Sequence, residues 1–338
     1  MLAIQDVRVI HQQICSWYDA HGRKQLPWRL TSNPYHVYLS EVMLQQTQVK
    51  TVLDKFYAPF LLRFPTLLSV AQANKEDILQ QWQGLGYYNR AINLWNTAQL
   101  TQGQLPSSIE ALTQLPGIGQ NTAHAIACFA FGQAVPILEA NVRRILARFY
   151  AIEHINISEL WRLSNLLLNK DDAFIHNQAL MDIGSSICTP KEPACYMCPL
   201  SQACQGRHHP HQYPNPTPTK ATPIRFKKIL ILCDSRGYVY LQQRHSRFLN
   251  GLFQFLEFEQ DETLAFNRQP IELNLVTFIG KVQQTYSHFQ LHAEIFLCNL
   301  HNTSNENSWY SQEQMNTLPV SKAETKIIAL LKKHMLLQ

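Results

Sequence analysis

The sequence predicts an all-α domain, residues 1–206, joined by a linker, residues 207–225, to a smaller α+β domain, residues 226–338. Apolar residues repeat with helical spacing in the first part, five prolines lie in the linker, and beyond it the apolar period changes to two. A chain of 338 residues is long enough for two domains with separate cores. Its composition, 46% apolar and 16% charged, places it among globular proteins.

Apolar spacing and helix-breaking residues predict the helices of the first domain. Two of them are WRLSNLLLN, residues 161–169, and NQALMDIGSSI, residues 177–187, with Pro, Gly and Asn between helical segments. A further set of apolar residues falls near one helical face: Val42, Val49, Leu53, Phe56 and Phe60.

A single carboxylate, Glu139, stands directly before another helical pattern. That pattern has one apolar face, formed by Val142, Ile145, Leu146 and Phe149. An acid at this position is often found because the free amides and the dipole of a helix N-terminus favour negative charge. Two roles are therefore open for Glu139, a helix cap or one member of a catalytic pair.

The second domain alternates in the manner of strands. KILILCDSRGYVYLQQ predicts two strands around a turn, and LFQFLEFE and HFQLHAEIFL predict more. In the last of these, Phe289, Leu291, Ala293 and Ile295 share one side. The tail SKAETKIIALLKKHMLL opens with capping-box spacing and predicts a closing amphipathic helix.

Charge and hydropathy give broad limits on location and partners. The net charge is +5, but residues 207–228 hold five basic groups and no acid, so the excess is local and is weak evidence for a polyanionic partner. We see no apolar stretch long enough to span a bilayer and no secretion signal. The expected location is the cytoplasm, in association with the nucleoid of a bacterium.

Four cysteines form the strongest local pattern in the chain. Cys188, Cys195, Cys198 and Cys204 have the spacing C-x6-C-x2-C-x5-C, which suits Zn²⁺ or an iron–sulfur cluster. A zinc ribbon more often has two C-x-x-C pairs, and the single pair here favours the cluster. The other cysteines are isolated and are expected to be small core residues.

A glycine-containing turn separates two predicted helices in LTQLPGIGQNTAHAIACFAF, residues 112–131. Gly117 and Gly119 allow a tight turn, and the next helix begins with unpaired amides that can hold a DNA phosphate. The alternative is an ordinary structural connection, because such turns are common between helices.

Several segments together carry a resemblance to a known family. LPWR (26–29), SEVMLQQTQV (40–49), GLGYYNRA (84–91), LPGIG (115–119), NQALMDIG (177–184) and the cysteine loop occur in that order. Together they resemble the adenine-specific mismatch DNA glycosylases of the MutY family, in the helix-hairpin-helix glycosylase superfamily. The resemblance covers essentially the whole chain. It implies a [4Fe-4S] cluster on the four cysteines and a monomer that acts on double-stranded DNA carrying 8-oxoguanine:adenine or guanine:adenine mispairs.

The resemblance also implies how adenine would be removed. Glu41 matches the general acid that protonates the purine at N7, and Glu139 matches the carboxylate that stabilises the oxocarbenium-like sugar. This chain reads Glu139-Ala140-Asn141-Val142, whereas relatives read Asp-Gly-Asn-Val. Since displacing a catalytic group by about 1 Å can cost on the order of a hundredfold in rate, a catalytically impaired lesion-binding protein is an alternative.

Further positions are assigned by the resemblance alone. Trp28, Arg29 and Gln178 are expected to line the adenine pocket, and Asn141 to orient the sugar or water. Gln45 and the Tyr87–Tyr88 pair resemble residues that wedge into the duplex when a nucleotide is flipped out. For the two tyrosines, core packing is the alternative.

Residue 121 distinguishes between two types of glycosylase chemistry. Strand-cleaving relatives carry a Lys two residues after the Gly-x-Gly for Schiff-base formation, and this chain has Asn121. The resemblance therefore implies base excision without strong strand cleavage, and makes a bifunctional pyrimidine-lesion glycosylase the less favoured alternative.

The C-terminal domain resembles a NUDIX domain more weakly than the first domain resembles a glycosylase. The segment EFEQDETLAFNRQP lacks the glutamate spacing that a NUDIX hydrolase uses to bind metal. The domain is therefore expected to recognise and not to hydrolyse. Tyr286, Ser287 and His288 match residues that contact 8-oxoguanine, and closing a hairpin is the alternative role of Ser287 and His288.

Overall fold

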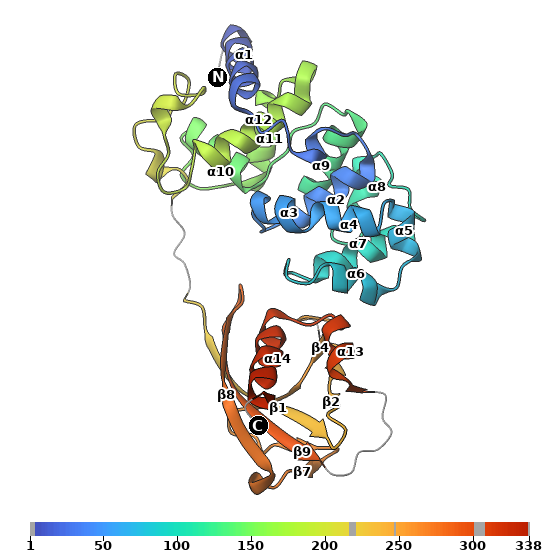
Figure 1. Ribbon diagram of the computed structural model, residues 1–338. Coiled ribbons are helices and arrows are strands. Elements are labelled where there is room, and N and C mark those ends of the chain that lie inside the picture. Colours follow the sequence, from blue (N-terminus) through green and yellow to red (C-terminus); the bar gives the residue numbers. More distant parts are fainter. Residues whose placement is uncertain (1–3, 216–220, 247, 301–307, 337–338) are drawn as a thin grey trace. The chain divides into compact units, whose positions relative to one another are not determined.

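Helices follow one another up to Ser186 in the computed structural model, which describes residues 4–215, 221–246, 248–300 and 308–336 (Figure 1). The chain folds into two compact units. The first comprises Met1–Ala71 and Asn96–Pro218, and the second comprises Gln72–Trp95 and Thr219–Gln338. Within the described residues, none of the helices combines the length and the apolar content that crossing a membrane would require.

The predicted all-α character of the first part is confirmed. Its helices are α1 (Ile4–His21), α2 (Pro34–Leu44), α3 (Val49–Lys55), α4 (Tyr57–Arg63), α5 (Leu67–Gln72), α6 (Lys75–Gln81), α7 (Asn89–Leu100), α8 (Ile109–Thr113), α9 (Gln120–Phe131), α10 (Ala140–Phe149), α11 (Ile157–Leu167) and α12 (Ala173–Ser186). Short 3-10 turns lie at Pro27–Arg29 (η1), Lys170–Asp172 (η2), Cys195–Met197 (η3) and Pro210–Gln212 (η4).

One predicted helical face is divided between three helices. The chain leaves the helix after Leu44, where Gln45 has a non-helical ψ of 113° and Gln46 a positive φ of 56°. Val42 and Phe60 are buried on different helices, whereas Leu53 is 39% exposed. The expectation of one continuous face over these residues is therefore wrong.

Two apolar clusters hold the first unit together and bring α10 and α12 to the site described below. One cluster joins α1, α10, α11 and α12, and it contains the whole predicted face of α10: Val142, Ile145, Leu146 and Phe149. The other cluster packs Val37 of α2 against Ala125 and Cys128 of α9. Consequently α2, α9, α10 and α12 are fixed relative to one another within this unit.

The second unit contains a mixed sheet, as the period of two predicts. Its strands are β1 (Ile224–Asp234), β2 (Val239–Tyr240), β3 (Gln242–Gln243), β4 (Phe253–Gln254), β5 (Leu256–Glu259), β6 (Ala265–Phe266), β7 (Gln269–Pro270), β8 (Val276–Thr285), β9 (Gln290–Leu300) and β10 (Trp309–Tyr310). The main sheet has the order β10-β2-β1-β9-β8, with β5 pairing with β1. β1 and β9 run parallel from Ile224↔Gln290 to Asp234↔Leu300, and β8 returns antiparallel to β9.

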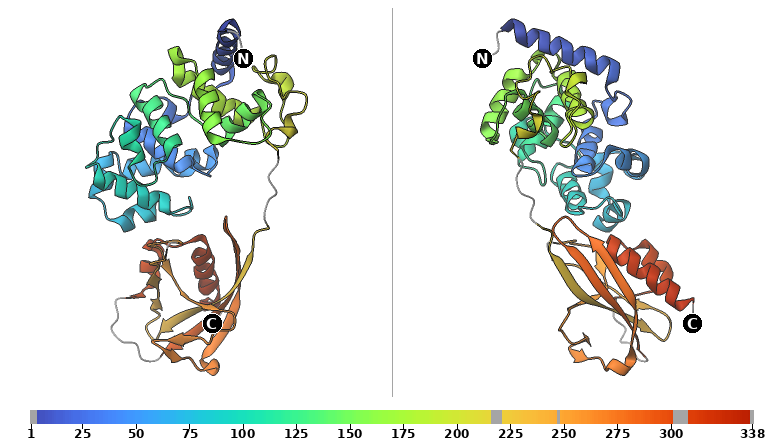
Figure 2. Two further views of the ribbon diagram at one scale, coloured as in Figure 1. Left: turned by 180° about the vertical axis from the view of Figure 1, so that it is seen from behind. Right: turned by 90° about the vertical axis from the view of Figure 1, so that its left-hand side faces the viewer.

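Helix α14 (Lys322–Met335) covers one face of this sheet, and α13 (Gln312–Thr317) precedes it (Figure 2). The side predicted to be apolar, Phe289 just before β9 and Leu291, Ala293 and Ile295 within it, is buried in the cluster that includes α14. Ser321 caps α14 as predicted, accepting hydrogen bonds from the backbone N–H groups of Ala323 and Glu324.

The first half of the predicted linker packs against the helical unit. Arg148 of α10 donates from Nε to the carbonyl oxygens of Pro210 and Tyr213, at 2.9 and 3.2 Å. The amide of Asn215 donates to the carbonyl oxygen of Glu153 at 2.9 Å. Residues 207–215 are thus held by α10 and by the loop that follows it, and residues 216–220 lie outside the described part of the chain.

Candidate active site

A pocket opens between η1, α2, α9 and α12, and Glu41 lies on its wall. Asn33 caps α2 by accepting from the backbone N–H groups of Tyr35 and His36, and Pro34 occupies the first helical position. The cap fixes the start of the helix, so that Glu41 falls two turns along it. The sequence predicts Trp28, Arg29 and Gln178 for the adenine pocket, and the structure places all three on the wall that contains Glu41.

Burial determines the ionisation of Glu41. Removal from water disfavours the carboxylate, and together with the charge of Glu139 this raises the Glu41 pKa to about 8, against a smaller opposing effect of Arg29. The side chain is therefore protonated at neutral pH. A buried carboxylic acid of this kind can act as a general acid.

Glu139 occupies the N-cap position of α10, yet its side chain makes no capping hydrogen bond. Its Oε1 instead accepts from Nδ2 of Asn141 at 3.2 Å. Burial raises the Glu139 pKa, while the Asn141 hydrogen bond and the charges of Arg23, Arg144 and Arg29 oppose the rise. Glu139 thus stands at the helix N-terminus without a capping hydrogen bond, and its charge contributes to the raised pKa of Glu41.

A second layer of contacts holds Asn141 in place. Its Oδ1 accepts from Nη2 of Arg144 at 2.8 Å, and the same Nη2 donates to the carbonyl oxygen of Gly184 at 2.7 Å. Gly184 is required for this arrangement because a Cβ atom there would lie 2.6 Å from Cβ of Asn141. The glycine of NQALMDIG thus lets α12 approach the residue that binds Glu139.

Arg29 lines the pocket, but its terminal nitrogens are already engaged. Nη1 and Nη2 donate to the Asp182 carboxylate at 2.7 and 2.8 Å, and Nε of Arg23 donates to the same carboxylate at 2.7 Å. Nε of Arg29 is buried without a hydrogen-bond partner among the described residues. Asp182 thus holds both arginines beside the pocket, a contact that sequence reasoning missed. The segment NQALMDIG contains Asp182, but its partners lie 153 and 159 residues away in the sequence.

The hairpin between α8 and α9 has the predicted turn. Gly117 has a φ of 74°, in the region that favours glycine, and Gly119 is the N-cap of α9 without any side-chain cap. The amides at the start of α9 therefore have no intrahelical acceptor and suit an anion. Thr122 on the first turn of α9 lies 3.5 Å from Nε2 of Gln45.

The two tyrosines predicted to wedge into DNA differ in exposure. Tyr88 is buried, at 5% exposure, and its hydroxyl accepts from the amide of Gly84 at 3.3 Å. Tyr87 is 42% exposed and has a positive φ of 51°. Core packing therefore describes Tyr88, and Tyr87 is the exposed member of the pair.

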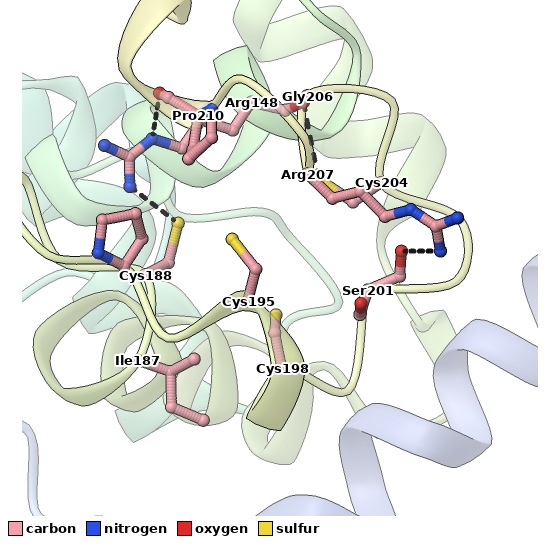
Figure 3. Close-up of a pocket in the computed structure, with 11 residues that line it drawn as sticks. Arg148, Ile187, Cys188, Cys195, Cys198, Ser201, Cys204, Gly206, Arg207 and Pro210 are labelled. Carbon is pink, nitrogen blue, oxygen red and sulfur yellow. Dashed lines mark hydrogen bonds between the residues drawn. The ribbon is translucent and has the colours of Figure 1, made fainter.

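The four predicted ligand cysteines line one cavity beside α10 (Figure 3). Arg148 lies at its edge and donates from Nη1 to Sγ of Cys188 at 3.3 Å. All four are free cysteines, and in the described part of the chain no three His, Cys, Asp or Glu side chains converge as they would around one metal ion. The four thiols therefore share one cavity, whose lining also includes Arg148.

The predicted recognition residues lie at the turn between β8 and β9. The amide of Tyr286 donates to the carbonyl oxygen of Phe289 at 2.9 Å and closes the turn. The Tyr286 ring is half-buried against Phe248 and Phe289, whereas Ser287 and His288 are exposed. The turn is thus closed through the backbone of Tyr286, and the Ser287 and His288 side chains face solvent.

Two family models match this chain. Residues 39–165 match the HhH-GPD superfamily of base excision DNA repair proteins, and residues 228–330 match the NUDIX domain. A solved structure of a thermostable thymine-DNA glycosylase is 27% identical, with a TM-score of 0.56, and the match covers 60% of this chain and 96% of that chain. These matches confirm the predicted glycosylase and NUDIX-like folds.

Curated relatives extend the likeness over the whole length. The adenine DNA glycosylase of Buchnera aphidicola subsp. Schizaphis graminum is 34% identical over 347 residues, covering 96% of this chain and 99% of the relative. The adenine DNA glycosylase of Homo sapiens is 38% identical over 227 residues, covering 62% of this chain and 41% of the relative. They favour neither the lesion-binding nor the pyrimidine-glycosylase alternative. The chain therefore belongs to the adenine DNA glycosylase family and is a base excision repair enzyme that hydrolyses the N-glycosidic bond of adenine.

Proposed function

We propose that this enzyme removes adenine mispaired with 8-oxoguanine or guanine in double-stranded DNA, with Glu41 as the general acid and Glu139 as the opposing carboxylate. The observation that carries the proposal is the Glu41 carboxyl, which lies in a pocket and has a pKa raised to about 8. We further propose that it acts as a monomer, associated with the nucleoid.

The proposed reaction needs both carboxyl groups in different ionisation states. Glu41 donates its proton to N7 of the flipped-out adenine, the bond between base and sugar breaks, and the neutral base departs. The sugar then carries positive charge, which an ionised Glu139 stabilises until water adds and loses a proton to a carboxylate. Arg23, Arg144 and Arg29 favour the ionised form of Glu139, which supports this assignment.

We assign the purine contacts to Trp28 and Gln178. Both are nearly fully buried in the pocket wall, and Trp28 packs edge-to-face against Tyr57 with ring centroids 5.1 Å apart. A fixed aromatic side chain and a primary amide can contact the face and the polar edge of a flipped base. Asp182 binds the terminal nitrogens of Arg29. We therefore propose that Arg29 fixes the pocket wall and supplies positive charge.

We assign DNA contacts outside the pocket to three further groups. The amides that follow Gly117 and Gly119 bind a phosphate, and Gln45 and the exposed Tyr87 enter the space left by the flipped nucleotide. Ser287 and His288 contact the 8-oxoguanine, with Tyr286 holding their turn closed.

We also propose that Cys188, Cys195, Cys198 and Cys204 hold a [4Fe-4S] cluster. The fit rests on the shared cavity, on the four free thiols, and on Arg148, whose guanidinium can balance thiolate charge. When bound, the cluster would cross-link the loop after α12 and thereby shape a DNA-binding surface. No proton or bond in the excision reaction involves it.

The opposite-base assignment can be tested with three duplexes that place 8-oxoguanine, guanine or thymine opposite adenine. We expect the fastest single-turnover excision opposite 8-oxoguanine. The substitution His288→Ala should slow that substrate several-fold and leave the guanine mispair nearly unchanged. Glu313→Ala, on the exposed surface of α13, is the matched control. Equal rates for all three duplexes would refute the assignment.

The pH profile of excision should report the two carboxyl groups. Burial raises the Glu41 pKa to about 8, so the required acid is present below that pH and is lost above it. The required ionised form of Glu139 is lost at low pH, and because its pKa is also raised this loss begins above the ordinary range of a glutamate. We expect a bell-shaped plot of kcat/KM, falling about tenfold per pH unit on the alkaline side. A rate that keeps rising above pH 8 would contradict the assignment of Glu41.

A further inference from the structure

Glu139 is the last residue of the segment between α9 and α10, and side chains from other elements form hydrogen bonds with the backbone of this segment. Residues 132–139 have no regular secondary structure. The amide of Ile137 donates to Oδ1 of Asn177 at 3.0 Å, and Nδ2 of Asn177 donates to the carbonyl oxygen of Val135 at 2.9 Å. Within the segment the amide of Val135 donates to the carbonyl oxygen of Gln133, and the contacts with Asn177 fix the segment against α12.

The contact nearest to Glu139 comes from Asn121. The amide of Leu138, the residue immediately before Glu139, donates to Oδ1 of Asn121 at 2.7 Å. On the other side of the same residue, Nε of Arg143 donates to the carbonyl oxygen of Leu138 at 3.2 Å. The Leu138 side chain is buried in the cluster of α1, α10, α11 and α12. Leu138 is thus fixed through its amide, its carbonyl and its side chain.

We propose that Asn121 is a positioning residue for Glu139, and that it acts by fixing the backbone through the Leu138 amide. The inference rests on the proposed role of Glu139. Asn121 is the second residue of α9 and lies two residues after Gly119, so it joins the proposed phosphate-binding turn to the segment that carries the carboxylate.

The local sequence gives this contact particular importance in this chain. Glu139 has a longer side chain than aspartate, so a small change in its backbone is carried to the carboxylate over a greater distance. A displacement of about 1 Å in a catalytic group can cost on the order of a hundredfold in rate. An amide cannot form a Schiff base, so the side chain at position 121 is available for a hydrogen-bonding role.

The test compares Asn121→Ala with Asn121→Asp, which keeps an acceptor oxygen at the same reach. On a duplex with adenine opposite 8-oxoguanine, we expect Asn121→Ala to lower the single-turnover rate about 10- to 100-fold. Its Kd for the duplex should change by less than about twofold. Asn121→Asp should recover much of the lost rate, because the Leu138 amide regains an acceptor.

The control is Asn156→Ala, which removes another asparagine that accepts from a backbone amide in the same unit, at 3.1 Å, away from the pocket. It should leave the excision rate unchanged. An Asn121→Ala enzyme with the wild-type rate, or one that loses DNA affinity and rate in proportion, would overturn the positioning role.

A parallel measurement on Glu139→Gln separates this inference from the proposed function. If Glu139→Gln slows excision and Asn121→Ala does not, the positioning role alone is refuted. If Glu139→Gln excises adenine at the wild-type rate, the catalytic role of Glu139 is refuted and the role of Asn121 with it.

Discussion

Replacing Glu41 with glutamine is expected to lower the single-turnover rate of adenine excision by about 10²- to 10⁴-fold. The amide has nearly the shape of the protonated carboxyl but cannot give up a proton at neutral pH. Because the wild-type acid is already neutral in its pocket, the substitution should leave the fold and the affinity for DNA close to those of the wild type. Quenched-flow excision and a binding titration on one mispaired duplex would measure both.

Lys50→Ala, in α3, provides a matched control, because it removes a charge that is paired with Asp54 on the exposed surface. This variant should excise adenine at the wild-type rate. Retention of that rate by Glu41→Gln would mean that another group protonates the base, and the assignment of the general acid would be wrong.

Replacing Glu139 with glutamine is expected to lower the rate by about 10²- to 10³-fold, the range typical for losing one preorganised electrostatic contact. The variant should also be more stable at neutral pH. Burial raises the Glu139 pKa, so the folded state holds a proton that the unfolded state loses, and stability falls as pH rises through the folded pKa. Glutamine does not ionise, so the variant should not lose stability as the pH rises. Thermal unfolding should therefore show a higher Tm for the variant than for the wild type at neutral pH, and equal Tm values in acid.

Glu110→Gln is the comparison, since Glu110 lies exposed in the first turn of α8. It should change neither the rate nor the pH dependence of Tm. A Glu139→Gln protein that is slower and also less stable at neutral pH would indicate a structural role for the carboxylate.

The sequence predicted those elements correctly whose structure depends on neighbouring residues. The apolar face of α10, the alternation in β9 and the Ser321 cap of α14 each depend on residues within one or two turns, and all three are confirmed. The break after Leu44 was not predicted. Apolar spacing continues across it, and the break lies in the backbone angles of Gln45 and Gln46, which that spacing does not reveal.

The supports of the site could not be predicted from local patterns. Asp182 of α12 binds Arg29. Arg144 joins Asn141 of α10 to Gly184 of α12. Asn121 of α9 accepts from the Leu138 amide in the segment before α10. A sequence shows the residue types but not which distant carbonyl or carboxylate each will meet. The resemblance supplied the two carboxylates, and the tertiary structure supplied the groups that position them.

The proposed pair of carboxyl groups is tested by comparing the natural protein with Glu139→Asp in single-turnover excision of adenine opposite 8-oxoguanine. We expect the natural protein to remove adenine, because Asn141 and the segment fixed at Leu138 hold the Glu139 carboxylate in place. A natural protein that binds the duplex tightly and leaves adenine in place, while Glu139→Asp removes it, would refute the proposed role of Glu139.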